Sequence, residues 1–126
     1  MNLFYIDTSV IVSLLFEEHG HKEFRKILKT GRALSSYFIE AELYSVAKRE
    51  GVALDIVRRF VEPLFLFTPS RPIAFECERI LKEHYCRGAD IYHLASALFL
   101  APNPRELKFV TCDNRQGAIA KALGFL

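Results

Sequence analysis

The sequence contains four aspartates, and two of them stand directly after apolar runs that read as buried strands. Asp7 follows the run at residues 3–6, and Asp113 follows the run at residues 107–112. Open α/β sheets place their ligands at the carboxyl ends of their strands, where the strand order reverses. If the two strands are neighbours at such a point, the carboxylates of Asp7 and Asp113 face one another across a crevice.

Asp90 is the third candidate, because it is expected to point towards the core. A helix is predicted from residue 90 to about residue 100, and Asp90 shares one face of it with Leu94, Ala97 and Ala101. An ionised carboxylate on such an apolar face needs a partner. Each of the three aspartates could instead cap a helix, which contributes about 1 kcal/mol. Serine, threonine or asparagine would cap equally well, so three aspartates favour a shared site.

A fourth acid is expected from the strongly patterned helix predicted over residues 37–50. Glu40 and Glu42 flank the apolar stripe of this helix, which is formed by Ile39, Leu43 and Val46. The two glutamates lie on opposite sides of that stripe, so hydrophobic periodicity does not choose between them. Both remain candidates at this point.

A cluster of carboxylates without histidine or cysteine suits a hard cation such as Mg²⁺ or Mn²⁺. Carboxylates packed together repel one another until a metal neutralises them. Phosphodiester hydrolysis is the chemistry that such a cluster can perform, because the metal activates water and stabilises the leaving oxyanion. Three arginines near these motifs are candidates for holding substrate phosphates, with solvated surface charge as the simpler interpretation of each: Arg49, Arg87 and Arg115.

Strands and helices alternate along the chain, which predicts a mostly parallel sheet with helices on both faces. Strands are expected at 3–6, 33–35, 64–67 and 107–112, and helices at 10–16, 22–29, 37–50, 54–61, 73–86, 90–100 and 114–123. Phe75, Ile80 and Leu81 are expected to face the core. Only a stub of a fifth strand is expected after Gly124. Together these elements predict one three-layer α/β domain over residues 1–126.

Composition excludes several classes of protein. Hydrophobic residues make up 51% and charged residues 25% of the chain, ordinary globular values that exclude disorder. No signal peptide is expected, and no apolar stretch approaches the roughly 20 residues that span a membrane. A cytoplasmic protein without membrane contact is therefore expected. The net charge of +2 does not by itself indicate nucleic-acid binding.

The three cysteines are odd in number and lack the C-x-x-C spacing of a zinc site. Cys77, Cys86 and Cys112 are therefore expected to be reduced, mostly buried thiols. The four histidines are scattered along the sequence and form no cluster with them.

Four short motifs, in this order, resemble those of the PIN-domain ribonucleases, and most closely the compact VapC-type toxins of toxin–antitoxin pairs. The motifs are Ile6-Asp-Thr-Ser9, Glu40-Ala-Glu-Leu43, Ala89-Asp-Ile-Tyr-His-Leu-Ala95 and Thr111-Cys-Asp113. They extend over the whole chain, whose length is typical of the family. The resemblance implies a parallel sheet of order 3-2-1-4-5, which would set Asp7 beside Asp113. Two departures are Gln116, where an aromatic or aliphatic residue is common, and the nearly absent final strand.

The resemblance also selects Glu42 over Glu40, because the acid of the family motif precedes a leucine in an Ala-Glu-Leu context. It implies that four acids bind Mg²⁺ or Mn²⁺ and cleave RNA: Asp7, Glu42, Asp90 and Asp113. Thr8, Ser9 and Thr111 would then hydrogen-bond those carboxylates or their waters. The implied partners are an RNA substrate, a cognate antitoxin protein and a second copy of the chain in a homodimer.

Other α/β proteins with acidic pockets fit the sequence less well. A phosphatase of the haloacid dehalogenase type needs a second aspartate where Ser9 stands, and a receiver domain needs an aspartate where Thr68 and Pro69 follow the third strand. Two alternatives remain: a PIN-type RNA-processing nuclease outside a toxin–antitoxin pair, and a PIN scaffold that binds RNA or protein without cleavage. The complete acid set favours a nuclease, because a scaffold gains nothing from carboxylates that repel one another.

Overall fold

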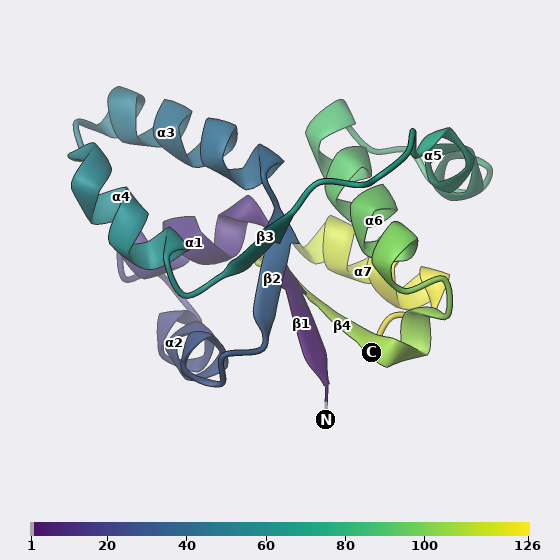
Figure 1. Ribbon diagram of the computed structural model, residues 1–126, viewed down its shortest axis with the longest axis horizontal. Coiled ribbons are helices and arrows are strands. Elements are labelled where there is room, and N and C mark those ends of the chain that lie inside the picture. The colour runs from purple at the N-terminus through teal and green to yellow at the C-terminus, as the bar shows by residue number, and fades with distance from the viewer. Residues whose placement is uncertain (1) are drawn as a thin grey trace.

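The computed structural model describes residues 2–126, and Met1 lies outside the described residues. Four strands form one parallel sheet in its centre (Figure 1). They are β1 (Leu3–Ile6), β2 (Ala33–Ser36), β3 (Phe65–Phe67) and β4 (Leu107–Val110), in the order β3-β2-β1-β4. The chain first adds strands on one side of β1 and then crosses to the other side. The strand order therefore reverses between β1 and β4. This is the point at which Asp7 and Asp113 were expected to face one another.

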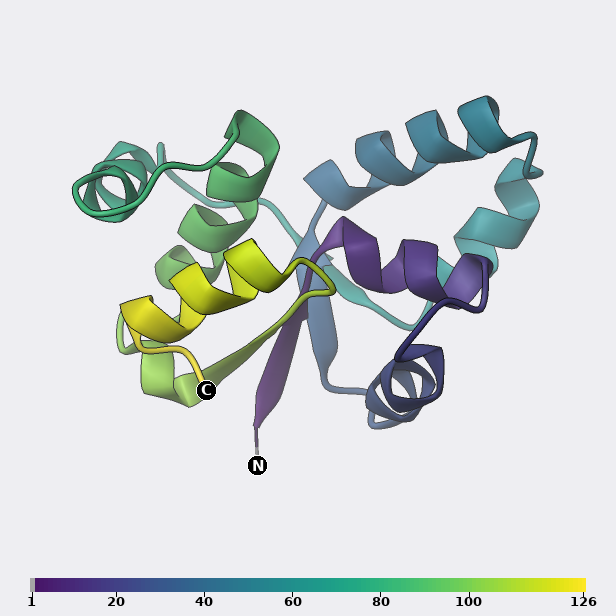
Figure 2. The ribbon, with the colours of Figure 1, turned by 180° about the vertical axis from the view of Figure 1, so that it is seen from behind.

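Helices cover both faces of this sheet. One face carries α1 (Thr8–Leu15), α2 (His21–Lys29), α3 (Phe38–Glu50) and α4 (Leu54–Val61); the other carries α5 (Ala74–Leu81), α6 (Gly88–Leu100) and α7 (Asn114–Leu123), and the short 3₁₀ helix η1 (Pro104–Glu106) leads into β4. Each face has its own apolar core. Seen from behind, α1 and α7 flank the sheet on opposite sides, and both begin near the middle of the molecule (Figure 2). This arrangement is the three-layer α/β architecture expected from the alternating elements.

The alternation of side chains along β1 explains the two cores. Ile6 packs with Val10, Ile11 and Leu43 on one face, whereas Tyr5 points to the other. The Tyr5 ring stacks on Phe109 of β4, with ring centroids 5.4 Å apart. Both faces of β1 are therefore buried, as expected for the central strand of a parallel sheet.

The predicted fifth strand is wrong: the part of the chain that the structure describes contains four. Gly124 ends α7 in the left-handed conformation (φ 105°), and Phe125 then turns into the core beside Phe109, 5.8 Å away between ring centroids. The Leu126 amide donates to the Leu107 carbonyl (3.1 Å). This segment thus lies beside β4 without extending the sheet, and the order is 3-2-1-4.

The prediction for α5 is also partly wrong. The helix ends at Leu81 and does not reach residue 86, and only Ile80 of the three residues expected to face the core is buried. Phe75 and Leu81 are 79% and 47% exposed. The apolar stripe that meets the core runs instead through Ile73, Cys77 and Ile80, which have the i, i+4, i+7 spacing of one helix face.

All three cysteines are free thiols, as expected, but only Cys86 is fully buried and Cys112 is exposed. Among the described residues, no helix is long and apolar enough to cross a membrane.

Candidate active site

The carboxyl ends of β1 and β4 lie side by side, because Ile6 pairs with Val110 in the parallel register. Asp7 follows β1 and is only 4% exposed. Its carboxylate accepts hydrogen bonds from the Ser9 amide (3.1 Å), the Ser9 hydroxyl (2.5 Å) and the Thr111 hydroxyl (2.6 Å). Asp7 therefore caps α1, as the simpler interpretation predicted, and also connects the ends of two strands.

The two hydroxyls that bind Asp7 also hold the loop after β4. Ser9 Oγ accepts a hydrogen bond from the Cys112 amide (2.8 Å), and Thr111 Oγ1 accepts one from the Asp113 amide (3.0 Å). Each hydroxyl thus donates to the buried carboxylate and accepts from the backbone of this loop. The position of Asp113 is in this way linked to that of Asp7.

Burial raises the pKa of Asp7 above its usual range. The hydrogen bonds from Ser9 and Thr111 oppose this rise, as does the charge of His93, while the negative charge of Asp90 adds to it. Three hydrogen bonds therefore do not fully compensate the carboxylate for its loss of water.

Glu42 points from α3 towards α1 and α6. Its Oε1 accepts a hydrogen bond from Thr8 Oγ1 (2.6 Å) and lies 2.6 Å from His93 Nε2. Burial alone would raise the pKa of Glu42, but the hydrogen bonds from His93 and Thr8, together with the charge of His93, lower that pKa. Glu40 lies elsewhere, where its Oε2 accepts a hydrogen bond from Tyr44 of the same helix (3.3 Å).

His93 was not among the residues predicted from the sequence. It is 2% exposed on α6, and its Nδ1 lies 2.8 Å from the Tyr5 hydroxyl. Burial raises the pKa of Tyr5 to about 12, so this hydroxyl stays protonated. The sequence did contain a signal: His93 follows Asp90 by three residues, which places both on one side of the helix.

Asp90 and Asp113 line the same cavity, which has a volume of about 460 Å³. Its other lining residues are Tyr85, Cys86, Arg87, Arg115, Gln116 and Ile119. Burial raises the pKa of Asp90, and the negative charges of Asp113 and Glu42 raise it further, against the opposing charges of His93 and Arg87. The negative charges of Asp113, in the loop after β4, and of Glu42, on α3, thus repel the carboxylate of Asp90 on α6.

Asp113 caps α7, because its Oδ1 accepts hydrogen bonds from the amides of Arg115 (2.9 Å) and Gln116 (3.1 Å). Neither bond uses Oδ2. Gln116, the residue that departs from the family pattern, is 3% exposed, and its Nε2 donates to the Asp90 backbone carbonyl (3.3 Å). This side-chain amide therefore ties α7 to the first turn of α6, where an apolar residue could not.

The three candidate arginines are placed differently. Arg87 and Arg115 line the cavity of Asp90 and Asp113. Arg115 Nη2 donates to the Tyr85 carbonyl (2.8 Å), and its guanidinium lies 5.7 Å from the centroid of the Tyr85 ring. Arg49 lies at the end of α3, lines a different cavity and bonds Glu50 (3.1 Å). Only two of the three arginines are therefore brought to the acids.

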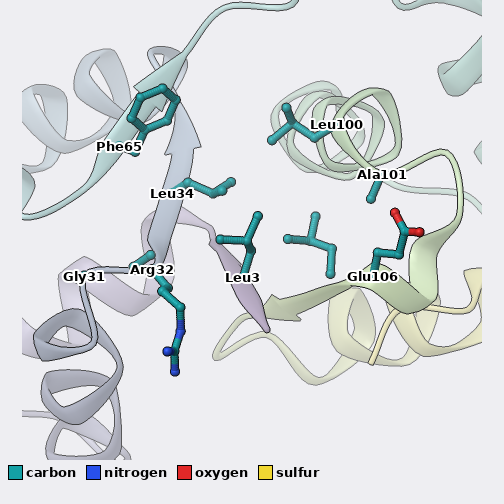
Figure 3. A pocket seen from close by; sticks show the side chains of 10 residues that line it. Leu3, Gly31, Arg32, Leu34, Phe65, Leu100, Ala101 and Glu106 are labelled. Atoms are coloured by element: carbon teal, nitrogen blue, oxygen red, sulfur yellow. The ribbon is translucent and has the colours of Figure 1, made fainter. Parts of the chain in front are cut away.

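A second cavity, of about 430 Å³, lies at the opposite, amino-terminal ends of the strands (Figure 3). Leu3, Leu34 and Leu100 point into it. Its lining is mainly apolar and contains one acid, Glu106. It lacks the paired carboxylates of the other end of the sheet, so the acidic end is the candidate active site.

The four acids have the chemistry of ligands for a divalent metal, but their side chains are not close enough together in this structure to hold one ion. Four carboxylates, at the residue after β1, on α3, on α6 and in the loop after β4, supply the oxygen ligands that Mg²⁺ and Mn²⁺ prefer. Within residues 2–126, however, no three His, Cys, Asp or Glu side chains are close enough together to hold an ion. Asp90 and Asp113 share a cavity, whereas Asp7 and Glu42 do not line it. In this conformation the four carboxylates therefore do not surround one common position.

Comparison with protein families places residues 4–122 in the family described as PIN domain. Comparisons with curated proteins and with solved structures each gave no match. The family match covers all four acids and confirms the resemblance to PIN domains. PIN domains are generally nucleases. The chain therefore belongs to the PIN domain family.

Proposed function

We propose that this protein is a metal-dependent endoribonuclease that hydrolyses RNA phosphodiester bonds. The observation that carries the proposal is the crowding of negative charge at the carboxyl ends of β1 and β4. Asp90 has its pKa raised by burial and by the charges of Asp113 and Glu42, and Asp7 by burial and the charge of Asp90. Such repulsion destabilises the fold at neutral pH, which a bound cation would reverse.

The proposed ligands for Mg²⁺ or Mn²⁺ are Asp7, Glu42, Asp90 and Asp113. When bound, the metal would polarise a phosphoryl oxygen and lower the pKa of a bound water. Ser9 and Thr111 orient the Asp7 carboxylate through their hydroxyls, and Thr8 does the same for Glu42. These hydrogen bonds hold two of the four proposed ligands before any metal arrives.

RNA phosphates are proposed to bind Arg87 and Arg115. Both line the cavity of Asp90 and Asp113, so a phosphate beside the acids lies within their reach. Arg115 is held by the Tyr85 carbonyl through one of its nitrogens, which leaves its other donors for a ligand. These two charges would offset the repulsion between the acids and an anionic substrate.

The narrower biological role follows from the family resemblance alone. We propose that the protein is a cytoplasmic toxin of a toxin–antitoxin pair, that it is a homodimer, and that a cognate antitoxin protein inhibits it. A monomer in sedimentation at micromolar concentration would contradict the proposed homodimer. Co-expression with the product of a neighbouring small reading frame would distinguish a toxin from an RNA-processing nuclease, because only a toxin is neutralised.

The test of the nuclease is cleavage of single-stranded RNA with Mg²⁺ or Mn²⁺ by the wild type and by Asp90→Asn. Asp55→Asn is the matched control, because Asp55 is an exposed aspartate in the first turn of α4. Cleavage by the wild type and the control, but not by Asp90→Asn, is expected. A wild type that binds RNA without cleaving it under any metal would support the non-catalytic scaffold instead.

A further inference from the structure

His93 is a buried, titratable side chain that the proposed chemistry does not use. From α6, its imidazole reaches two other elements of the fold. Nδ1 lies 2.8 Å from the Tyr5 hydroxyl of β1, and Nε2 lies 2.6 Å from Glu42 Oε1 of α3. Thr8 of α1 completes the group, with its hydroxyl 2.6 Å from the same glutamate oxygen. A histidine that merely filled space would need no such chain of polar partners.

We propose that His93 is a positioning residue that holds the Glu42 carboxylate in one orientation, with Tyr5 fixing the imidazole from its other side. The inference rests on the proposed function, in which Glu42 is a metal ligand. His93 Nε2–H and the Thr8 hydroxyl both donate to Oε1, and neither uses Oε2. The second oxygen therefore remains available to a cation, while the first is held by the protein.

The direction of these hydrogen bonds follows from the donors present. Thr8 has one proton, which it gives to Glu42 Oε1, and an ionised carboxylate can only accept. A contact of 2.6 Å between that carboxylate and His93 therefore requires the proton to be on Nε2. Thr8 Oγ1 lies 3.4 Å from Nε2 and is a second, longer acceptor for the same N–H.

Packing keeps the imidazole from turning away. The Tyr5 ring meets it edge-on, with centroids 5.8 Å apart, and the Phe38 ring lies 5.9 Å from it on another side. His93 itself is 2% exposed. An unsupported glutamate explores many rotamers, whereas a buried ring fixed at both nitrogens gives Glu42 a rigid partner.

The first test is calorimetric titration of the metal-free protein with Mn²⁺. Loss of such a supporting hydrogen bond typically weakens metal binding by about 10–100-fold, which is the loss expected for His93→Ala. His93→Gln, whose side-chain amide reaches about as far as Nε2, should recover most of that affinity. A purely structural histidine would not be rescued by glutamine in this way.

Tyr5→Phe tests the same inference without touching a carboxylate or removing the ring stack, and so serves if His93→Ala fails to fold. Losing one buried hydrogen bond should weaken Mn²⁺ binding by about threefold to tenfold. Tyr44→Phe is the matched control, because Tyr44 donates to Glu40, away from the proposed ligands. Wild-type affinity in Tyr5→Phe, or in a folded His93→Ala, would overturn the inference.

A second readout needs no metal. Nitrogen-15 NMR of the metal-free protein should show His93 protonated at Nε2, and a bare Nε2 would overturn the positioning role whatever the activity. If Nε2–H is present and bonded to Glu42 but the wild type binds no Mn²⁺, the orientation of Glu42 stands and the proposed metal-dependent function fails. If the wild type binds Mn²⁺ and cleaves RNA with Nε2 bare, the function stands and this inference fails.

Discussion

The Thr111 hydroxyl should contribute measurably to the stability of the protein, and Thr111→Val tests this. Valine keeps the shape of threonine but removes the donor to Asp7 Oδ2 (2.6 Å) and the acceptor for the Asp113 amide (3.0 Å). A hydrogen bond to an ionised group contributes about 1.5–3 kcal/mol. The second bond adds little, because Asp113 is exposed and its amide can bind water. For a domain of this size, the expected fall in Tm is roughly 5–15 °C.

The assay is thermal unfolding of the metal-free protein at pH 7, beside Thr68→Val as the control. Thr68 is exposed in the loop after β3, so its replacement should change the Tm little. The deficit of Thr111→Val should shrink as the pH falls through the raised pKa of Asp7, because a protonated carboxyl no longer accepts a charge-assisted bond. Equal melting of the two variants at pH 7 would refute the stabilising network around Asp7.

Three further predictions concern the charges of the site. Asp90→Asn should raise the Tm of the metal-free protein at pH 7, because it removes repulsion by Asp113. The same variant should lose any gain in Tm that Mn²⁺ gives the wild type, whereas Asp55→Asn should show neither effect. Asp7 and Asp90 have folded pKa values above their unfolded values of about 4. The free energy of unfolding of the metal-free protein should therefore fall as the pH rises from about 4 through the folded pKa values. A free energy of unfolding that urea titrations show to be independent of pH in this range would contradict these shifts. Arg115→Gln should raise KM for RNA about tenfold with a smaller effect on kcat, because Arg115 lines the acidic cavity. Arg49→Gln should leave KM unchanged, because Arg49 lines a different cavity. Equal KM values for the two variants in steady-state assays would count against Arg115.

The sheet was largely predictable because its signals are local. Buried parallel strands give short apolar runs, and the helices between them give clear periodicity, so the elements and the order of the first four strands follow from the sequence and its family resemblance. The sequence also predicted that Asp7 and Asp113 lie beyond the carboxyl ends of two neighbouring strands, although β4 ends at Val110, earlier than expected. The end of the chain was harder, because Phe125 turns into the core instead of extending the sheet.

The contacts of the site were less predictable, because they join residues far apart in the sequence. His93 and Glu42 are separated by 51 positions, and no periodicity connects them. The bond from Arg115 to the Tyr85 carbonyl likewise fixes the segment after α5, where the sequence pattern alone predicted a longer helix. The choice of Glu42 over Glu40 required the family motif, since both glutamates border the same apolar stripe.

The most direct test of the central claim is RNA cleavage by Asp113→Asn. Asparagine caps a helix about as well as aspartate, so it can keep the bonds of Oδ1 to the Arg115 and Gln116 amides. It lacks the charge that a divalent cation requires. If Asp113 is a ligand of a nuclease centre, the variant should fold and melt at or above the Tm of the metal-free wild type, because the repulsion of Asp90 is relieved, but fail to cleave single-stranded RNA with Mg²⁺ or Mn²⁺. Full cleavage by a folded Asp113→Asn would show that the residue is only a helix cap and would contradict the proposed centre.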